Sequence, residues 1–405
     1  MNHSLPTNAR AAAIQPSATL AVSGRAKQLK AEGKQVLPLG SGEPDFCPPA
    51  PVVEAVRDYI SKNPVLYTEV PGTAALRDAI ADDLEAHHGR RFARDELLVS
   101  CGAKHSLANL FLVTLEPGDE VVIPAPYWVS YPDMVRLGGG TPVIAATSPE
   151  HGLRLQPDAL ARVLSPRTRF LVLNSPSNPT GVGYTGAQLR ALGEVLAAKA
   201  PQAWLLCDDI YRHLVYDGFV QESAFRALDG VTEQIILVDG VSKSHAMTGF
   251  RIGYMAGPRE VVGAAARVQG QMTSGASTIS QVAATAALTD PRARASIGEM
   301  REAFARRRAL VLAGLSDIPG VRTPRPDGAF YVFPDVSRFV GEGARFADDL
   351  ALAAWLLEEK LVAVVPGTPF GAPGHLRISY ATSDDTLREA LSRLQEAFRS
   401  LPARA

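Results

Sequence analysis

The sequence is poor in cysteine, and its three cysteines, Cys47, Cys101 and Cys207, lie far apart. Their number is odd and their spacing matches no metal-ligand pattern, so neither a disulfide framework nor a cysteine metal centre is indicated. Proteins of oxidising compartments usually carry paired cysteines. We therefore expect a reducing, cytoplasmic location and no metal.

Long hydrophobic runs and an excess of charge of one sign are also missing. No apolar run reaches the roughly 18 residues of a membrane-spanning helix. Lys and Arg number 41 and Asp and Glu 42, so nothing favours nucleic acid or an anionic membrane as a partner. The first 31 residues lack acidic side chains, which faintly resembles a transit peptide. We expect instead a flexible tail, residues 1–15, followed by a basic helix.

The regular alternation of short apolar segments with helix-length stretches is the main structural signal between residues 96 and 257. It predicts an α/β fold with a mainly parallel sheet covered by helices on both faces. The expected strands are 97–100, 120–123, 142–145, 170–174, 204–207, 235–238 and 253–256. Expected helices between them include 104–114, 157–164 and 186–199.

The pattern changes after about Pro291, where a smaller α+β unit is expected. Its expected elements are a long helix at 293–315, a helix near 347–360, a strand at 375–380 and a final helix from Ser383. A helix at 22–32 should pack against this unit. We therefore expect a large domain over 49–292 and a small domain formed by 16–48 and 293–405, among 405 residues in all.

Lys243 directly follows the strand expected at 235–238 and has Ser242, Thr248 and Arg251 near it. Desolvation there would favour a neutral amine, which can form a Schiff base with an aldehyde. Arg251, beside small hydroxyl residues, suits a phosphate dianion. An aldehyde and a phosphate on one small molecule indicate pyridoxal 5′-phosphate (PLP). Taken alone, such a pair is more often a surface lysine and a structural arginine.

Further polar strings lie where expected strands end, which is where the active sites of parallel sheets collect. The turn 100–104 offers backbone N–H groups to an anion at a helix start. Trp128 could stack on a flat ring, and Asn178 could donate to a phenolate or carboxylate. An ordinary strand–helix turn, a core aromatic and a rigid proline turn remain alternatives.

Two charged residues sit in apolar strands. Asp208 ends one, and a protonated pyridine nitrogen would supply the cation that a buried carboxylate needs. Tyr211 could reach the ring oxygen, and Arg377 implies a bidentate carboxylate partner. The alternatives are helix capping by Asp208 or Asp209 and an internal ion pair of Arg377. Together, these sequence segments supply every group that PLP chemistry needs.

With these strings, the chain resembles the class I (fold type I) PLP-dependent aminotransferases, in particular the bacterial aspartate aminotransferase subgroup. The resemblance runs from about Pro16 to Leu394 and includes the motifs at 40–46, 124–131, 174–181, 208–211, 241–254, 363–367 and 376–383. It implies a large domain with a mainly parallel seven-stranded sheet, a smaller α+β domain, PLP as cofactor and an obligate homodimer with shared sites.

The resemblance also implies a role for each matching residue. Lys243 would hold the cofactor covalently and move the substrate proton, with Asp208 on the pyridine nitrogen and Tyr211 on the ring oxygen. The other cofactor contacts would be Gly102, Ala103, Lys104, Trp128, Asn178, Ser242, Arg251 and, from the neighbouring subunit, Tyr67. The substrate α-carboxylate would meet Arg377, Asn178 and the backbone of Gly42, and Trp128 would also contact the substrate. Asp209, Phe250 and the pair Cys47-Pro48 depart from the usual residues, but none of these changes removes a catalytic group.

The substrate expectation rests on Ser17, Thr19 and Lys104, which occupy the places that recognise an acidic side chain in the resembling subgroup. A lysine point charge over a carboxylate is physically sensible. The segment 269–277 is similar to the branch with bifunctional aspartate/prephenate aminotransferases. We therefore expect ping-pong transamination between aspartate or glutamate and a 2-oxo acid, with prephenate as a further acceptor.

Other functions remain as alternatives. An aminotransferase for aromatic or many amino acids, or another PLP enzyme of this fold such as a β-lyase, stays open because a fold does not dictate a reaction. A ligand-sensing domain of a transcription regulator is disfavoured by the near-neutral charge and the short segment before the match. A nicotinamide-dependent dehydrogenase is disfavoured because no G-x-G-x-x-G follows a strand.

Overall fold

A seven-stranded sheet dominates the computed structural model, which describes residues 7–231 and 234–402. Its strand order is β2-β8-β7-β6-β5-β3-β4. The strands are β2 (Leu97–Cys101), β3 (Glu120–Pro124), β4 (Thr141–Ala145), β5 (Thr168–Asn174), β6 (Trp204–Asp208), β7 (Ile235–Gly240) and β8 (Ile252–Ala256). Neighbours pair in parallel except at β8, which runs antiparallel to β2 and β7. The expected mainly parallel sheet is therefore confirmed.

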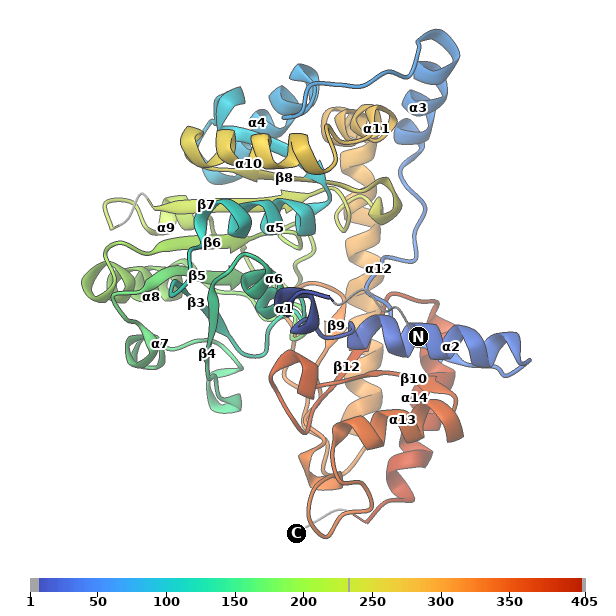
Figure 1. Ribbon diagram of the computed structural model, residues 1–405. Coiled ribbons are helices and arrows are strands. Elements are labelled where there is room, and N and C mark those ends of the chain that lie inside the picture. Colours follow the sequence, from blue (N-terminus) through green and yellow to red (C-terminus); the bar gives the residue numbers. More distant parts are fainter. Residues whose placement is uncertain (1–6, 232–233, 403–405) are drawn as a thin grey trace, which may run out of the picture.

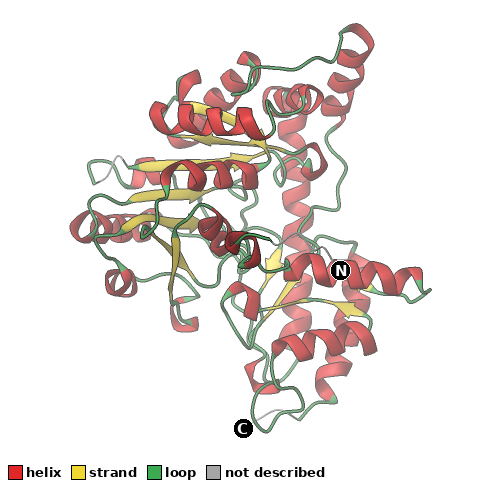
Figure 2. Cartoon of the chain, viewed as in Figure 1, coloured by secondary structure: helices red, strands yellow, loops and turns green. Residues whose placement is uncertain are grey.

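Side chains of the central strands alternate between two cores, one on each face of the sheet. In β6, Leu205 and Cys207 belong to one buried cluster, whereas Leu206 belongs to the other. Because both faces are covered there, the central parts of β5, β6 and β7 are continuous apolar runs, as expected for a parallel sheet. Figure 2 shows the helices on either side of the strands.

The helices around this sheet come from the first three quarters of the chain. They are α3 (Ala50–Lys62), α4 (Ala74–His88), α5 (Ala103–Thr114), α6 (Tyr131–Leu137), α7 (Pro157–Val163), α8 (Gly186–Lys199), α9 (Ala224–Ala227), α10 (Arg259–Met272) and α11 (Thr278–Thr289). Short 3₁₀ helices are η1 (Arg94–Glu96), η2 (Pro149–His151) and η3 (Thr248–Phe250).

The long helix α12 (Pro291–Ser316) leads from the large sheet to a second group of elements (Figure 1). These are β9 (Tyr331–Val332), η4 (Ser337–Phe339), α13 (Asp349–Glu359), β10 (Val362–Ala363), β11 (Val365–Pro366), η5 (Thr368–Phe370), β12 (Leu376–Ser379) and α14 (Asp384–Arg399). An antiparallel sheet has the order β11-β12-β9, and β1 (Leu37–Pro38) pairs in parallel with β10. This group therefore combines small sheets with helices.

Helix α2 (Ala18–Ala31) joins this second group although it lies near the other end of the chain. Its Ala26 and Leu29 pack with Leu357 and Ala363. Helix α1 (Ala9–Ala12) falls within the expected tail and lies against α6. Residues 1–6 of that tail and 403–405 of the expected small domain lie outside the described residues, and the domain limits stay a prediction. None of the helices in the described ranges is long and apolar enough to cross a bilayer.

Candidate active site

A cavity of about 670 Å³ opens where the carboxyl ends of β5 and β6 meet the second group of elements. Most residues expected at a site line it, although they come from distant parts of the chain. They are Ser17, Thr19, Gly42, Ala103, Lys104, Trp128, Asn178, Asp208, Tyr211, Ser242, Lys243, Arg251 and Arg377. Two expected residues, Gly102 and Tyr67, are not part of its wall.

Lys243 enters the cavity from the turn after β7. All residues of that strand are buried, and so are Val241 and Ser242 between the strand and the lysine. Its Nζ donates a 2.6 Å hydrogen bond to the carbonyl of Gly42. Burial lowers the pKa of this amine from 10.5 to about 8. A substantial fraction of the lysine is therefore a neutral nucleophile near physiological pH.

Asp208 is the last residue of β6 and only 3% exposed. The hydroxyl of Tyr131 donates to its Oδ2 at 2.5 Å, and the backbone N–H of Ile210 donates to Oδ1 at 3.4 Å. Burial raises the pKa of this carboxyl from 3.8 to about 6. No helix starts at Asp208, so the capping alternative does not apply. The acid has hydrogen-bond donors but, among the described residues, no ion pair.

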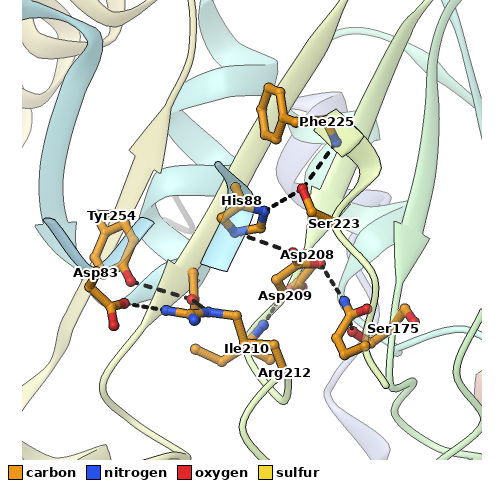
Figure 3. Close-up of polar contacts among 12 residues, drawn as sticks. Asp83, His88, Ser175, Asp208, Asp209, Ile210, Arg212, Ser223, Phe225 and Tyr254 are labelled. Atoms are coloured by element: carbon orange, nitrogen blue, oxygen red, sulfur yellow. Dashed lines mark hydrogen bonds and ion pairs between the residues drawn. The ribbon is translucent and has the colours of Figure 1, made fainter. Parts of the chain in front are cut away.

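A separate group of buried charges lies near Asp208 (Figure 3). Arg212 donates from Nε to Asp239 at 2.6 Å and also pairs with Asp83. Its positive charge is thereby matched by carboxylates away from the cavity.

The neighbouring Asp209 meets the ring of His88, with 3.9 Å between Oδ2 and Nε2 (Figure 3). Burial raises the pKa of Asp209 well above its usual value and lowers that of His88 to about 2. Burial thus disfavours the charged form of each group. Of the two neighbouring acids, Asp208 is the one that lines the cavity.

Arg377 lies in β12 with 2% of its surface exposed. Its Nη1 donates to Asn178 Oδ1 and its Nη2 to the carbonyl of Gly40, both at 2.9 Å. Its Nε is buried without a hydrogen-bond partner. The internal ion pair that sequence reasoning left open is not found within the described chain. A buried guanidinium on a cavity wall with no carboxylate partner suits an incoming carboxylate.

The hydroxyl of Tyr211 lies 3.0 Å from that of Tyr331, and the guanidinium of Arg377 stands 4.6 Å from the Tyr331 ring centroid. This places Tyr211 and Arg377 on one continuous polar wall. Tyr331 belongs to β9 of the second group of elements, so this part of the wall depends on both groups packing together.

The turn between β2 and α5 has the form of an anion cradle. Gly102 has φ +85°, and a Cβ on it would come within 2.5 Å of Arg251 Nη2. A Cβ on Gly253 would come within 2.0 Å of the Ala103 nitrogen. Glycine is favoured at position 102 by its positive φ, and at position 253 because any side chain would collide with the backbone of Ala103. The first N–H groups of α5 have no acceptor inside the helix, and with Arg251 they suit a phosphate.

Lys104 and Trp128 form another part of the wall. The Lys104 Nζ lies 4.8 Å from the centroid of the Trp128 ring. Burial and, secondly, the charge of Arg251 lower the pKa of Lys104. Ser17 and Thr19 line the same cavity from the start of α2. A second cation and two hydroxyls are thus available to a negatively charged group.

Tyr67 is the one expected side chain that stands well away from the cavity. It lies in the loop between α3 and α4 and is 96% exposed. Within one copy of the chain, it has no place at the site.

Sequence reasoning missed three contributors. These are Tyr131, which donates to Asp208; Tyr331, beside Tyr211; and Asn174, whose Nδ2 donates to the Asp208 carbonyl at 2.8 Å. Tyr131 ends the 124–131 motif and lies three residues after Trp128. Its place in that motif was the available signal, and the turn before α6, in which the Tyr131 N–H donates to the Trp128 carbonyl at 3.0 Å, brings the two residues together.

Comparison with known proteins agrees with this geometry. The family described as "Aminotransferase class I and II" matches residues 34–394. The chain is 46% identical over 388 residues to an aspartate/prephenate aminotransferase of Cereibacter sphaeroides, covering 95% of this chain and 96% of that protein. It is 45% identical over 392 residues to an aspartate aminotransferase of Rhizobium meliloti, covering 96% and 95%.

Solved structures give the same result. The crystal structure of the aspartate aminotransferase from Rhizobium meliloti matches with a TM-score of 0.92 at 43% identity. The match covers 98% of this chain and 100% of that chain. The aspartate aminotransferase from Thermus thermophilus with maleate has a TM-score of 0.91 at 42% identity, covering 97% and 100%. With the family match extending over most of its length, the chain belongs to the class I and II aminotransferases.

Proposed function

We propose that this protein is a PLP-dependent aminotransferase that moves an amino group between aspartate or glutamate and a 2-oxo acid in a ping-pong cycle. The observation that carries the proposal is Arg377, a buried guanidinium without a carboxylate partner in the described chain. It shares one cavity with Lys243 and Asp208. A substrate carboxylate, an aldehyde and a pyridinium nitrogen would respectively satisfy these three groups.

The residues present fit PLP. The Gly102–Lys104 turn, Ser242 and Arg251 would hold its phosphate, since a Cβ on Gly102 would clash with Arg251 and the turn opens α5. Asp208 would accept a hydrogen bond from the protonated pyridine nitrogen. That nitrogen would supply the positive charge that the buried carboxylate lacks. Tyr211 and Asn178 would hold the ring oxygen, and Trp128 would cover a ring face. When bound, PLP supplies an electrophilic aldehyde and a ring that accepts the electron pair released at the substrate α-carbon.

The chain's own groups then have defined tasks. The Nζ of Lys243, partly neutral through burial, would hold the cofactor through its aldehyde carbon. Once the substrate amine has displaced it from that carbon, the free amine of Lys243 would accept the α-proton of the substrate. Arg377 and Asn178, already bonded to each other at 2.9 Å, orient the α-carboxylate. The backbone of Gly42, whose carbonyl accepts from Lys243, borders the same space. Such positioning can lower a barrier by roughly 7–11 kcal/mol in favourable systems.

The lowered pKa of Lys243 predicts how cofactor capture depends on pH. With a pKa of about 8, the neutral amine rises roughly tenfold between pH 7 and pH 9 and then levels off. The quantity to follow is the rate at which the apoprotein captures PLP, divided by the rate for a free lysine derivative in the same buffers. This ratio should fall as pH rises, because the neutral fraction of the free amine is still increasing where that of Lys243 has levelled off. Stopped-flow absorbance measures both rates. A constant ratio up to pH 10 would mean that Lys243 titrates like an ordinary lysine.

Replacing Arg377 tests the carboxylate site. Arg377→Lys keeps the charge but loses the planar fork and the bond to Asn178. We expect kcat/KM for aspartate to fall about 10- to 100-fold, as for the loss of a charged hydrogen bond, while PLP content stays at the parent level. Arg322→Lys is the control, since Arg322 is an exposed residue paired with Asp335. An unchanged kcat/KM would remove Arg377 from substrate binding.

Acidic specificity is supported by Lys104, Ser17 and Thr19 on the cavity wall. The named relatives include aspartate and aspartate/prephenate aminotransferases, and one solved relative was studied with maleate, a dicarboxylate. A steady-state screen with aspartate, glutamate and aromatic or aliphatic donors tests this, with 2-oxo acids and prephenate as acceptors. Activity confined to aromatic or aliphatic donors would contradict the acidic assignment. Products formed without any 2-oxo acid would favour a β-lyase.

We further propose a homodimer in which Tyr67 reaches the cofactor phosphate of the second copy. Val65, Leu66 and Tyr67 are 49%, 68% and 96% exposed, an unusual run of large apolar side chains on a surface. The division into a large domain (49–292) and a small domain (16–48 and 293–405) belongs to the same proposal. The scarcity of cysteine supports a cytoplasmic setting.

A further inference from the structure

The loop that carries Tyr67, residues 63–73, has exposed side chains but an anchored backbone. We name it the Tyr67 loop; it joins α3 to α4 and passes beside α10 and α11 (Figure 1). A side chain that is 96% exposed has little of its own surroundings to fix it. The position of the Tyr67 hydroxyl therefore depends on what holds the backbone beneath it.

Gln281 of α11 is one such anchor and is fully buried, at 0% exposure. Its Oε1 accepts from the Thr73 N–H at 2.8 Å. Its Nε2 donates to Thr68 Oγ1 and to the Ala276 carbonyl, both at 2.8 Å. The amide thus has a partner for its oxygen and for both its hydrogens, and two of these three partners belong to the Tyr67 loop. From the same helix, the Thr278 hydroxyl donates to the Leu66 carbonyl.

Gln269 of α10 is a second buried anchor, also at 0% exposure. Its Nε2 donates to the carbonyls of Val70, at 3.1 Å, and Val99, at 2.9 Å, while its Oε1 accepts from Asn109 at 3.0 Å. The Val99 N–H in turn donates to the Pro71 carbonyl at 2.9 Å. Val99 lies in β2, the edge strand of the large sheet. The loop therefore covers an edge whose backbone groups would otherwise lack partners.

Glycines make this joint too tight for side chains. A Cβ on Gly275 would lie 2.8 Å from Thr68 Oγ1 and 2.9 Å from the Glu69 carbonyl oxygen. Gly72 has φ +104°, and a Cβ there would meet the Val99 side chain at 2.6 Å. The segment 269–281 and the Tyr67 loop are thus fitted to each other. None of residues 269–281 lines the cavity, so contact with the site in their own copy does not explain them.

We propose that Gln269, Thr278 and Gln281, here called the glutamine clamp, are positioning residues that hold the Tyr67 loop ready to present Tyr67 to a second copy. The inference rests on the homodimer of the proposed function. Buried amides with all partners satisfied make a loop rigid. A rigid loop loses less conformational freedom when its tyrosine binds. The clamp thereby acts on cofactor binding from a distance, through Tyr67.

A double-mutant cycle tests the clamp. Gln269→Met with Gln281→Met keeps similar side-chain volume and removes the hydrogen bonds. The readout is the dissociation constant of PLP from the apoprotein by equilibrium dialysis, with the dimer checked by sedimentation. We expect Tyr67→Phe to weaken binding about 10-fold, the clamp variant to weaken it similarly, and the combined variant to be no weaker than the clamp variant. The two losses of affinity should not add, because in the clamp variant the Tyr67 hydroxyl no longer reaches the cofactor and its removal then costs nothing further.

Control variants separate this role from general stability. Gln395→Met in α14 loses one bond, to the Gly314 carbonyl at 2.9 Å, and should bind PLP like the parent. If the clamp variant does not fold, Thr278→Val removes a single anchor and should weaken binding to a smaller extent. Three outcomes would overturn the inference. They are parent-like PLP affinity in a folded clamp variant, loss of the dimer in that variant, and a combined variant in which the two losses of affinity multiply. If Tyr67→Phe alone leaves the dissociation constant of PLP unchanged, the proposed contact of Tyr67 with the cofactor of the second copy is wrong. The inference about the glutamine clamp is then wrong as well.

Discussion

Lys243→Ala should abolish transamination and the absorbance band of the covalent link between lysine and cofactor. The side chain is the proposed point of covalent attachment, and its Nζ donates to the carbonyl of Gly42 on the cavity wall. General-base catalysis alone is worth about 10²- to 10⁴-fold, and covalent attachment adds to that. We therefore expect kcat to fall by about 10⁴-fold or more, measured with aspartate and 2-oxoglutarate.

Two further measurements make this result specific. Lys199→Ala, at the exposed end of α8, should behave like the parent protein in both rate and absorbance. Borohydride reduction followed by mass spectrometry should place the cofactor adduct on Lys243. An adduct on another lysine, or near-normal turnover in Lys243→Ala, would show that the lysine has been assigned the wrong role.

Asp208→Asn should separate catalysis from stability. The amide is nearly isosteric and can still accept from Tyr131, but it cannot balance a protonated pyridine nitrogen. Removing one preorganised electrostatic partner costs about 10²- to 10³-fold in kcat, and we expect a loss of at least that size. The spectrum of the bound cofactor should also change, because its ring nitrogen is no longer held in the protonated form.

Although Asp208→Asn should lower activity, it should not lower the free energy of unfolding of the apoprotein at neutral pH. Burial raises the pKa of Asp208 from 3.8 to about 6, so ionisation is costly in the folded state. A group shifted in this way contributes stability at low pH that is lost as pH rises through about 6, on the order of 3 kcal/mol for this shift. Above that pH, Asp208→Asn apoprotein should be at least as stable as the parent.

About half of this loss falls between pH 5 and pH 8, so denaturant unfolding of parent and variant at these two pH values measures it. Asp385→Asn is the control, because Asp385 is an exposed residue paired with Arg388 on α14. A variant that loses both stability and activity at pH 8 would mean that Asp208 supports the fold rather than the cofactor.

Much of the large sheet was predictable from local pattern. Each of its seven strands is an apolar run bounded by turn residues, and the observed ends differ from the expected ones by only one or two residues. Helix α11 has no clear polar stripe, because it is rich in Ala and Thr and largely buried, so local pattern indicates it only weakly. The antiparallel direction of β8 was also beyond local pattern, since strand direction depends on the path of the connection.

The positions of Lys243 and Asp208 followed from chain order alone, because each comes at or just after the end of a buried strand of a parallel sheet. Their partners did not. Arg377 meets Asn178 across 199 positions of sequence, and Tyr131 meets Asp208 across 77. Periodicity reports only which face of an element is apolar, whereas such contacts depend on how distant elements pack. Tertiary structure therefore decided that Arg377 is left without a carboxylate, that Asp208 receives a tyrosine hydroxyl, and that Tyr67 points away from its own cavity.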